Sequence, residues 1–283
     1  MKYLITGAAG MLGRDLQAAL AGRDVTAFDR AQLDITDLAA VMTATVGFDV
    51  IINAAAYTKV DDAETNEDAA YAINAVGPHN LALAAAAQNA RLVQISTDYV
   101  FDGSATEPYS EDTTIDPISA YGRTKAAGEA FVLATHPTGS YIVRTAWLYG
   151  EHGPNFPKTM LKLAAARDTL TVVDDQVGQP TWTADLAAQV VALLDANAPA
   201  GIYHGTNSGV TSWFGFAQAV FAQANLDPAR VTPTDSSQFV RPAPRPSYSV
   251  LGHDAWQSAG LAPMRDWREA LADAQAQRIF EEK

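Results

Sequence analysis

The chain has 283 residues, 48% hydrophobic and 18% charged, as expected for a globular protein with one large core or two smaller ones. Its 19 Lys+Arg against 32 Asp+Glu give a net charge of −13, which disfavours nucleic acid and anionic membranes as partners. Cysteine is absent, which excludes a disulfide framework, a thiolate metal site and a cysteine nucleophile.

The N-terminus predicts a dinucleotide site. Residues 2–6 form a short apolar run, and leucines at 12, 16 and 20 recur at helical spacing, so a strand leads through a glycine turn into a helix. The first glycine permits the tight turn, the second lets the backbone approach a pyrophosphate, and the third lets the helix pack on the strand. These glycines are Gly7, Gly10 and Gly13.

A carboxylate follows the next predicted strand, residues 24–28. Asp29 can accept hydrogen bonds from an adenosine ribose and would repel a 2′-phosphate, whereas Arg30 beside it could bind one. The sequence therefore predicts NADH or NADPH as cofactor, with a preference for NADH.

Strands and helices alternate through the first half of the chain. Strands are predicted at 50–53, 91–95 and 141–144, with one long helix at 63–90 and another through Tyr121. This order predicts a Rossmann-type, doubly wound parallel α/β sheet with right-handed crossovers. Ligands bind at the carboxyl ends of such strands. The residues that fall there are Gly7, Asp29, Ala54, Thr97 and Thr145.

Tyr121 and Lys125 lie four residues apart, and Thr97 lies 24 positions before Tyr121. Residues i and i+4 share a helix face, and a lysine ammonium beside a phenol favours the phenolate. The pair could therefore donate and accept a proton near neutral pH. The spacing alone is common on ordinary helices, so its meaning depends on the nucleotide site.

The composition changes near Gly150, which predicts a smaller C-terminal α/β substrate lobe over the cofactor. The expected division is a dinucleotide-binding domain at 1–148 and a substrate domain at 149–283, with 183–205 returning to the first. Thr183 is expected to cap the helix at 184–194. A phosphorylated substrate would need basic residues gathered at its site, and the candidates are Lys158, Arg241 and Arg245.

The glycine motif, the run Asn53-Ala-Ala-Ala56, Thr97 and the Tyr121/Lys125 pair together resemble the extended short-chain dehydrogenase/reductase family. The resemblance is to its nucleotide-sugar reductases, and it covers nearly the whole chain. It implies reduction of a sugar ketone with NADH or NADPH, a step that requires no metal, although some members of the family are linked to a magnesium ion between subunits. The stretches that carry it, in order, are 33–37, 53–61, 96–102, 121–129, 144–150, 155–160, 175–181 and 245–249.

The resemblance also implies a role for individual residues. Tyr121 would give the ketone oxygen its proton, Lys125 would hold the nicotinamide ribose, and Thr97 would donate to the same oxygen. The implied cofactor residues, besides Tyr121 and Lys125, are Gly7, Gly10, Met11, Leu12, Gly13, Asp29, Arg30, Asp34, Ile35, Ala54, Ala55 and Ala56. The implied substrate residues are Thr58, Val60, Thr97, Asp98, Tyr99, Trp147, Asn155, Lys158 and Arg245.

Other members of this fold remain as alternatives. A sugar 4,6-dehydratase resembles Thr-Asp-Glu after this strand, where two carboxyls work as acid and base, but the third position here is Tyr99. A nucleotide-sugar epimerase shares the glycines and the Tyr/Lys pair. A non-catalytic regulatory subunit would bind nucleotide and a partner enzyme.

Several features receive a structural interpretation. The five histidines lack metal spacing and are expected on the surface or in loops, so no metal site is predicted: His79, His136, His152, His204 and His253. Tryptophans 182, 213, 256 and 267 are expected in the core, whereas Trp147 is expected to face the pocket. The first strand begins at residue 2 and no apolar run approaches ~20 residues, so a cytoplasmic protein without a signal peptide or membrane helix is expected. A homodimer is left open.

Overall fold

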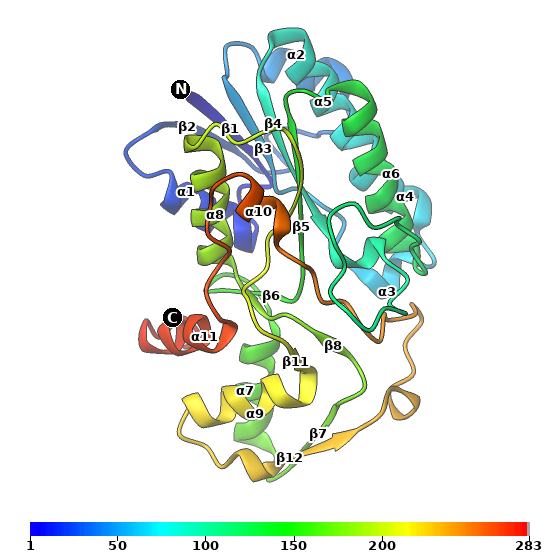
Figure 1. Cartoon of the computed structure of the whole chain (residues 1–283), viewed down its shortest axis with the longest axis vertical. Helices are drawn as coiled ribbons and strands as arrows, with labels where there is room; N and C mark the ends of the chain where they lie inside the picture. Colours follow the sequence, from blue (N-terminus) through cyan, green and yellow to red (C-terminus); the bar gives the residue numbers. More distant parts are fainter. Residues whose placement is uncertain (282–283) are drawn as a thin grey trace.

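The computed structural model describes residues 1–281. Its centre is a six-stranded, wholly parallel sheet in the order β10-β5-β4-β3-β1-β2 (Figure 1). The strand order reverses between β1 and β3, which makes their carboxyl ends the topological switch point where ligands bind. The predicted doubly wound fold is confirmed. The strands are β1 Lys2–Thr6, β2 Asp24–Phe28, β3 Val50–Asn53, β4 Arg91–Thr97, β5 Ser140–Thr145 and β10 Gly201–His204.

Alternate residues of each strand face the two helical layers. In β1, Tyr3 and Ile5 pack with helices α1 and α8, whereas Leu4 packs with α2, α5 and α6 on the other face. Both faces are covered, so the central strands are continuous apolar runs. The helices are α1 Met11–Ala19, α2 Leu38–Ala44, α5 Gly77–Gln88, α6 Ala120–Thr135 and α8 Thr183–Asp195.

The single long helix predicted at 63–90 is wrong in detail. The chain forms α3 (Val60–Ala63) and α4 (Glu67–Tyr71), then a π-helical segment Ala72–Val76 that runs into α5. Pro78 stands in the first turn of α5 and has no N–H to donate, which favours a change of helical register there. The side chain of Asn74 instead bonds the backbone of Tyr57, so the widened turn holds the loop after β3.

The lower lobe in Figure 1 has its own core, centred on Phe216, Phe221 and Trp267. Short two-stranded pairings hold it: β7 with β12 and β6 with β9 are parallel, and β8 with β11 is antiparallel. The elements are β6 Leu148–Tyr149, α7 Phe156–Ala166, β7 Leu170–Val173, β8 Val177–Gly178, β9 Thr181–Trp182, β11 Thr211–Ser212, α9 Trp213–Gln223, β12 Val231–Thr234 and α11 Trp267–Ala276.

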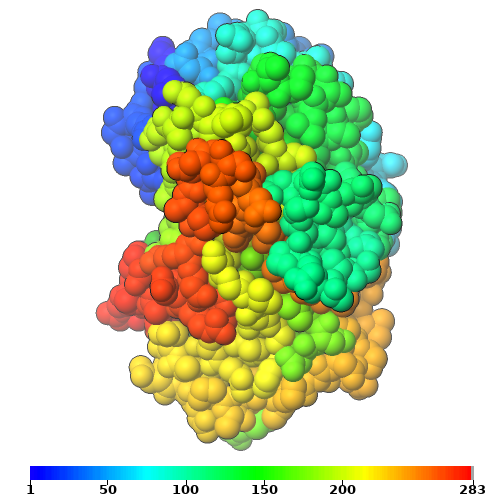
Figure 2. Space-filling view, viewed as in Figure 1, coloured from blue at the N-terminus to red at the C-terminus, as the bar shows by residue number. Residues whose placement is uncertain are grey.

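The chain passes back and forth between the lobes. Helix α8 packs against α1, β10 extends the main sheet beside β5, and α10 (Asp254–Ser258) contacts β10. Figure 2 shows the orange α10 segment lying against the blue-green loop, where Ala255 N donates to the Glu111 carboxylate at 3.1 Å. Thr183 does not cap α8 as expected: the helix begins at Thr183 itself, and the hydroxyl donates to Tyr149 O.

Within residues 1–281, no helix is long and apolar enough to cross a membrane.

Candidate active site

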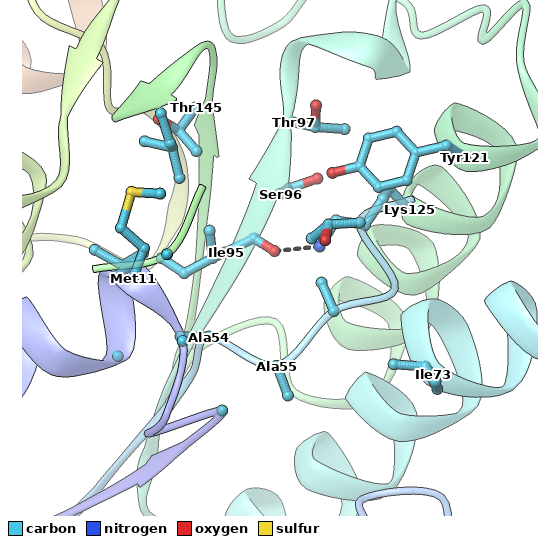
Figure 3. A pocket seen from close by; sticks show the side chains of 18 of the residues that line it. Met11, Ala54, Ala55, Ile73, Ile95, Ser96, Thr97, Tyr121, Lys125 and Thr145 are labelled. Atoms are coloured by element: carbon cyan, nitrogen blue, oxygen red, sulfur yellow. Dashed lines mark hydrogen bonds between the residues drawn. The ribbon is translucent and has the colours of Figure 1, made fainter. Parts of the chain in front are cut away.

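A cavity of about 880 Å³ lies at the carboxyl ends of the central strands and is lined by residues of both lobes (Figure 3). Every residue expected on the cofactor side lines it, from Gly7 to Lys125. Six of the nine residues expected on the substrate side also line it: Thr58, Val60, Thr97, Asp98, Tyr99 and Trp147.

The glycine turn after β1 leaves no room for side chains. Gly7 has φ +73°, and a Cβ there would lie 2.5 Å from Ala55 N. A Cβ on Gly13 would lie 2.3 Å from Gly7 O. Helix α1 has no side-chain cap at Gly10, so first-turn amides remain available to an anion. This bare cradle fits a dinucleotide pyrophosphate.

The end of β2 supplies the acidic rim of the cavity. Asp29 accepts hydrogen bonds from Ala31 N at 2.8 Å and Gln32 N at 3.1 Å, which fixes its carboxylate beside Arg30. Hydrogen bonds from Thr36 lower the pKa of Asp34, and the Arg30 guanidinium adds to that effect. Both a ribose acceptor and a phosphate partner are therefore present at this end.

Helix α6 brings Tyr121 and Lys125 to the end of β4. Its N-terminus is fixed because Ser119 Oγ accepts from Gly122 N, and the Glu64 carboxylate accepts from Ala120 N at 2.8 Å. Lys125 Nζ donates to Ile95 O, and the Tyr121 ring points its hydroxyl toward the strand end (Figure 3). The two side chains lie on the same side of the cavity, across from Met11 of α1 (Figure 3).

The electrostatics of the pair differ from the expectation. Burial raises the pKa of Tyr121 to about 12, although a hydrogen bond with Thr97 partly lowers it. Burial lowers the pKa of Lys125 to about 8, with Glu129 acting in the opposite direction. Lys125 was expected to lower the pKa of Tyr121, but the cost of desolvating the phenolate dominates and the pKa is raised.

Two buried hydroxyls missed by the sequence analysis line the cavity. Ser96 Oγ and Thr145 Oγ1 are buried without a hydrogen-bond partner in the described residues, and Thr145 lies beside Thr97 in the register of β4 and β5. Thr145 had been placed at a strand end but given no role. Unsatisfied hydroxyls on a cavity wall fit a polar ligand, since a buried donor without a partner costs free energy.

The two lobes meet at a stacked pair of tryptophans. The rings of Trp147 and Trp213 lie 3.6 Å apart at 9°, and both line the cavity. Trp147 adopts φ +47°, a conformation that few side chains tolerate, and Gly178 makes room for its ring. Trp213 was expected in the core; it packs against the core of the second lobe but is only partly buried, because it begins α9 where the cavity opens. Trp182, Trp256 and Trp267 are buried as expected.

Three expected substrate residues do not reach the cavity wall. Asn155 caps α7 and donates to Gly150 O at 2.8 Å, and Lys158 Nζ donates to Glu151 O. Arg245 forms an ion pair with Asp61 at 2.9 Å and lies over the Tyr99 ring.

The expectation that the histidines lie on the surface or in loops is wrong for His204, which is buried in β10 and hydrogen-bonds Gly252 O. His136 lies in the loop after α6 as expected, but it is buried there and hydrogen-bonds Ala90 O. Burial lowers the pKa of His204 to about 3, and the nearby Arg144 guanidinium adds to the effect. In the described part of the chain, no cluster of three His, Cys, Asp or Glu side chains is placed to hold a metal ion.

A doubly wound sheet with a glycine cradle at its switch point and a Tyr/Lys pair at the neighbouring strand end defines an oxidoreductase of the short-chain dehydrogenase/reductase class. Within that class, the model of the RmlD substrate binding domain family matches residues 1–279. The chain belongs to this family.

Its relatives are reductases of nucleotide sugars. The chain is 52% identical over 281 residues to a dTDP-4-dehydrorhamnose reductase of Streptomyces griseus, covering 96% of this chain and 92% of the relative. It is 49% identical over 277 residues to a dTDP-4-keto-6-deoxy-D-glucose reductase of Streptomyces niveus, covering 96% of each.

A crystal structure of dTDP-4-dehydrorhamnose reductase from Bacillus anthracis, in complex with NADP, matches with a TM-score of 0.94 at 42% identity and covers 98% of this chain and 100% of that one. A UDP-glucose 4-epimerase of Thermus thermophilus, at 21% identity and a TM-score of 0.80 over 98% of each chain, shares the fold alone.

Proposed function

We propose that the protein reduces the C4 keto group of dTDP-4-dehydro-6-deoxy-L-mannose to give dTDP-L-rhamnose, using NADH or NADPH, within dTDP-rhamnose biosynthesis. One observation carries the proposal: a single cavity joins the glycine cradle, the Tyr121/Lys125 pair and an aromatic wall from the second lobe. The identity to named reductases of this substrate class supports it.

The residues fit the chemistry of ketone reduction. A nicotinamide cofactor, when bound, would supply the hydride. The α1 amides and glycines would hold its pyrophosphate, and Lys125 would hold its ribose hydroxyls with the two donors that Ile95 O leaves unused. Tyr121 keeps its proton at neutral pH because burial raises its pKa, so it can release that proton as negative charge develops on the ketone oxygen.

The second donor to that oxygen would be Thr97, whose hydroxyl lies beside Tyr121. Lys125 would then stabilise the phenolate left on Tyr121. On the sugar side we assign the wall residues proposed from sequence and add Trp213. These residues are Thr58, Val60, Asp98, Tyr99, Trp147 and Trp213.

We propose that the protein can use either NADH or NADPH. Asp29 favours NADH and Arg30 offers a partner for a 2′-phosphate, and the Bacillus anthracis relative was crystallised with NADP. We assign residues 1–148 with 183–205 to dinucleotide binding and 149–283 to substrate binding, because β10 joins the main sheet while α7 and α9 build the opposite lobe. A cytoplasmic location and a homodimer belong to the same proposal and rest on family membership.

A second candidate is a different dTDP-4-keto-6-deoxy sugar, because the Streptomyces niveus relative bears that name at nearly the same identity. The test supplies each 4-keto sugar, made in situ, together with NADPH, and follows nicotinamide absorbance and product stereochemistry. Stoichiometric NADPH loss with formation of dTDP-L-rhamnose supports the proposal. Turnover of the other sugar alone favours the second candidate. Conversion without net NADPH loss indicates an epimerase, and failure to bind either sugar indicates a regulatory subunit.

A further inference from the structure

The hydroxyl of Thr97 has a single proton to donate, and both Asp98 and Tyr121 lie within reach of it. Thr97 Oγ1 donates to Asp98 Oδ1 at 2.9 Å and accepts from Tyr99 N at 3.2 Å. A hydroxyl has one donor and two acceptor positions. The proposed reaction needs that donor on the ketone oxygen. While an ionised Asp98 takes the Thr97 proton, no donor is left for the substrate.

The environment of Asp98 allows its carboxyl to exist in both the neutral and the ionised form. Its side chain is 2% exposed and lines the cavity, and Oδ2 is buried without a hydrogen bond of normal geometry. Burial raises the pKa of Asp98 to about 6, and the hydroxyls of Ser249 and Thr97 offset this only in part. Its carboxyl therefore exists in both forms close to neutral pH.

We propose that Asp98 is a positioning residue whose neutral acid form donates to Thr97 Oγ1 and so turns the Thr97 proton toward the ketone oxygen of the substrate. The donors and acceptors then balance: Thr97 accepts from Tyr99 N and from Asp98, and donates to the substrate. The ionised form of Asp98 reverses this hydrogen bond and withdraws the donor. The inference rests on the proposed function and deepens it.

No bond to Asp98 breaks during turnover. A bound nicotinamide cofactor would supply the hydride to the ketone carbon, Tyr121 would give its proton to the ketone oxygen, and the C=O double bond would become a C–O single bond. Asp98 and Thr97 keep their protons throughout, and Tyr121 recovers its proton from solvent. In the proton-transfer step, Asp98 acts by orienting the Thr97 hydroxyl.

The groups around Asp98 do not titrate in the same range. On α6, the pKa of Tyr121 is raised to about 12. In the short turn that contains Asp98 itself, burial raises the pKa of Tyr99 above that of Tyr121, although the charge of Arg245 acts against this rise. Arg245 is itself paired with Asp61, and Ser249 faces Asp98 with a neutral hydroxyl. A pH dependence below the pKa of Lys125, about 8, that is absent from an Asp98 variant therefore reports on Asp98 and not on His152 at the other end of the cavity lining.

The test is the pH profile of kcat from about pH 5 to about pH 7.5, at saturating sugar nucleotide and NADPH. For the unmodified protein we expect kcat to fall roughly tenfold with rising pH as Thr97 loses its free proton. Asp98→Asn should flatten the profile to within about twofold, because an amide N–H donates at every pH. Deuterated NADPH shows whether hydride transfer limits the rate measured.

The exposed carboxylate of Asp116 provides the matched control, and Asp116→Asn should keep the full slope. A slope that survives in Asp98→Asn overturns the inference. An unmodified protein that oxidises no NAD(P)H with the sugar contradicts the proposed function instead, so the two failures are distinct.

A second measurement needs no turnover. NMR titration of ¹³C-labelled aspartate should give Asp98 a higher pKa in Thr97→Val than in the unmodified protein, because both forms of Asp98 lose a hydrogen bond and the charge-assisted bond to the ionised form is the stronger one. An unchanged pKa would mean that Thr97 and Asp98 are not linked, and the inference would fall.

Discussion

The two walls of the cavity differ in how they are built. The sheet-lobe wall consists of strand ends and the first turns of α1 and α6, so backbone geometry alone places Gly7, Asp29 and Tyr121. The opposite wall consists of side chains from loops far apart in sequence, with Trp147 from the end of β5 stacked on Trp213 from α9. The first wall therefore carries the chemistry common to the class, and the second can vary with the substrate.

The largest effect is expected on the sheet-lobe wall. Tyr121→Phe should lower kcat by about 10³-fold or more, because Tyr121 is the proposed proton donor and its hydroxyl is hydrogen-bonded with Thr97. The dissociation constant for NADPH, measured by fluorescence titration, should stay within about threefold. Loss of cofactor binding in this variant would mean that Tyr121 is structural.

Lys125→Met tests the same wall through stability. Burial lowers the folded-state pKa of Lys125 to about 8, below its ordinary value of 10.5, so between these values the unfolded chain binds a proton that the folded chain does not. The contribution of Lys125 to the free energy of unfolding therefore rises with pH between about 8 and 10.5. Lys125→Met should be more stable below pH 8 by on the order of 2 kcal/mol and lose that advantage by about pH 10.5. Urea unfolding of the ligand-free proteins measures it, and a pH-independent difference contradicts the buried charge.

The aromatic wall should respond in substrate binding rather than in chemistry. Trp213→Ala removes the ring stacked on Trp147 and should raise KM for the sugar nucleotide by about tenfold, with KM for NADPH unchanged. Trp213→Phe, which keeps a stacking face, is the matched control and should recover most of the affinity. Equal changes in both KM values would show that the two walls are not separable.

The smallest effect concerns the adenosine end. Asp29→Ala removes the carboxylate that repels a 2′-phosphate, while Arg30 remains, so the ratio of kcat/KM for NADPH over NADH should rise by about fivefold. Steady-state assays with both cofactors give that ratio. An unchanged ratio would remove Asp29 from cofactor selection.

The sequence predicted the sheet-lobe wall well because its residues are fixed by local patterns. The glycine spacing, the acid after β2 and the Tyr121 helix each depend on a short stretch, and all their predicted residues line one cavity. The other wall depends on contacts between distant segments. Arg245 pairs with Asp61 across 184 positions, and the placement of Trp213 follows from packing between lobes. No local sequence pattern could therefore predict the ion pair or the position of Trp213.

Local patterns also could not report burial. The pKa of Tyr121 rises because the surrounding cavity wall excludes water. The π-helical segment before α5 depends both on the hydrogen bonds of the Asn74 side chain and on the missing N–H of Pro78. Ser96 had one usable signal, its position directly before Thr97 on β4, and Thr145 had its place at the end of β5.

Deuterium transfer tests the central claim most directly. NADPH deuterated at the transferred position is mixed with dTDP-4-dehydro-6-deoxy-L-mannose and the protein, and the product is analysed by NMR. The account predicts one NADPH consumed for each sugar converted and deuterium at C4 of dTDP-L-rhamnose. Conversion without net NADPH loss, or a product without deuterium at C4, would contradict it.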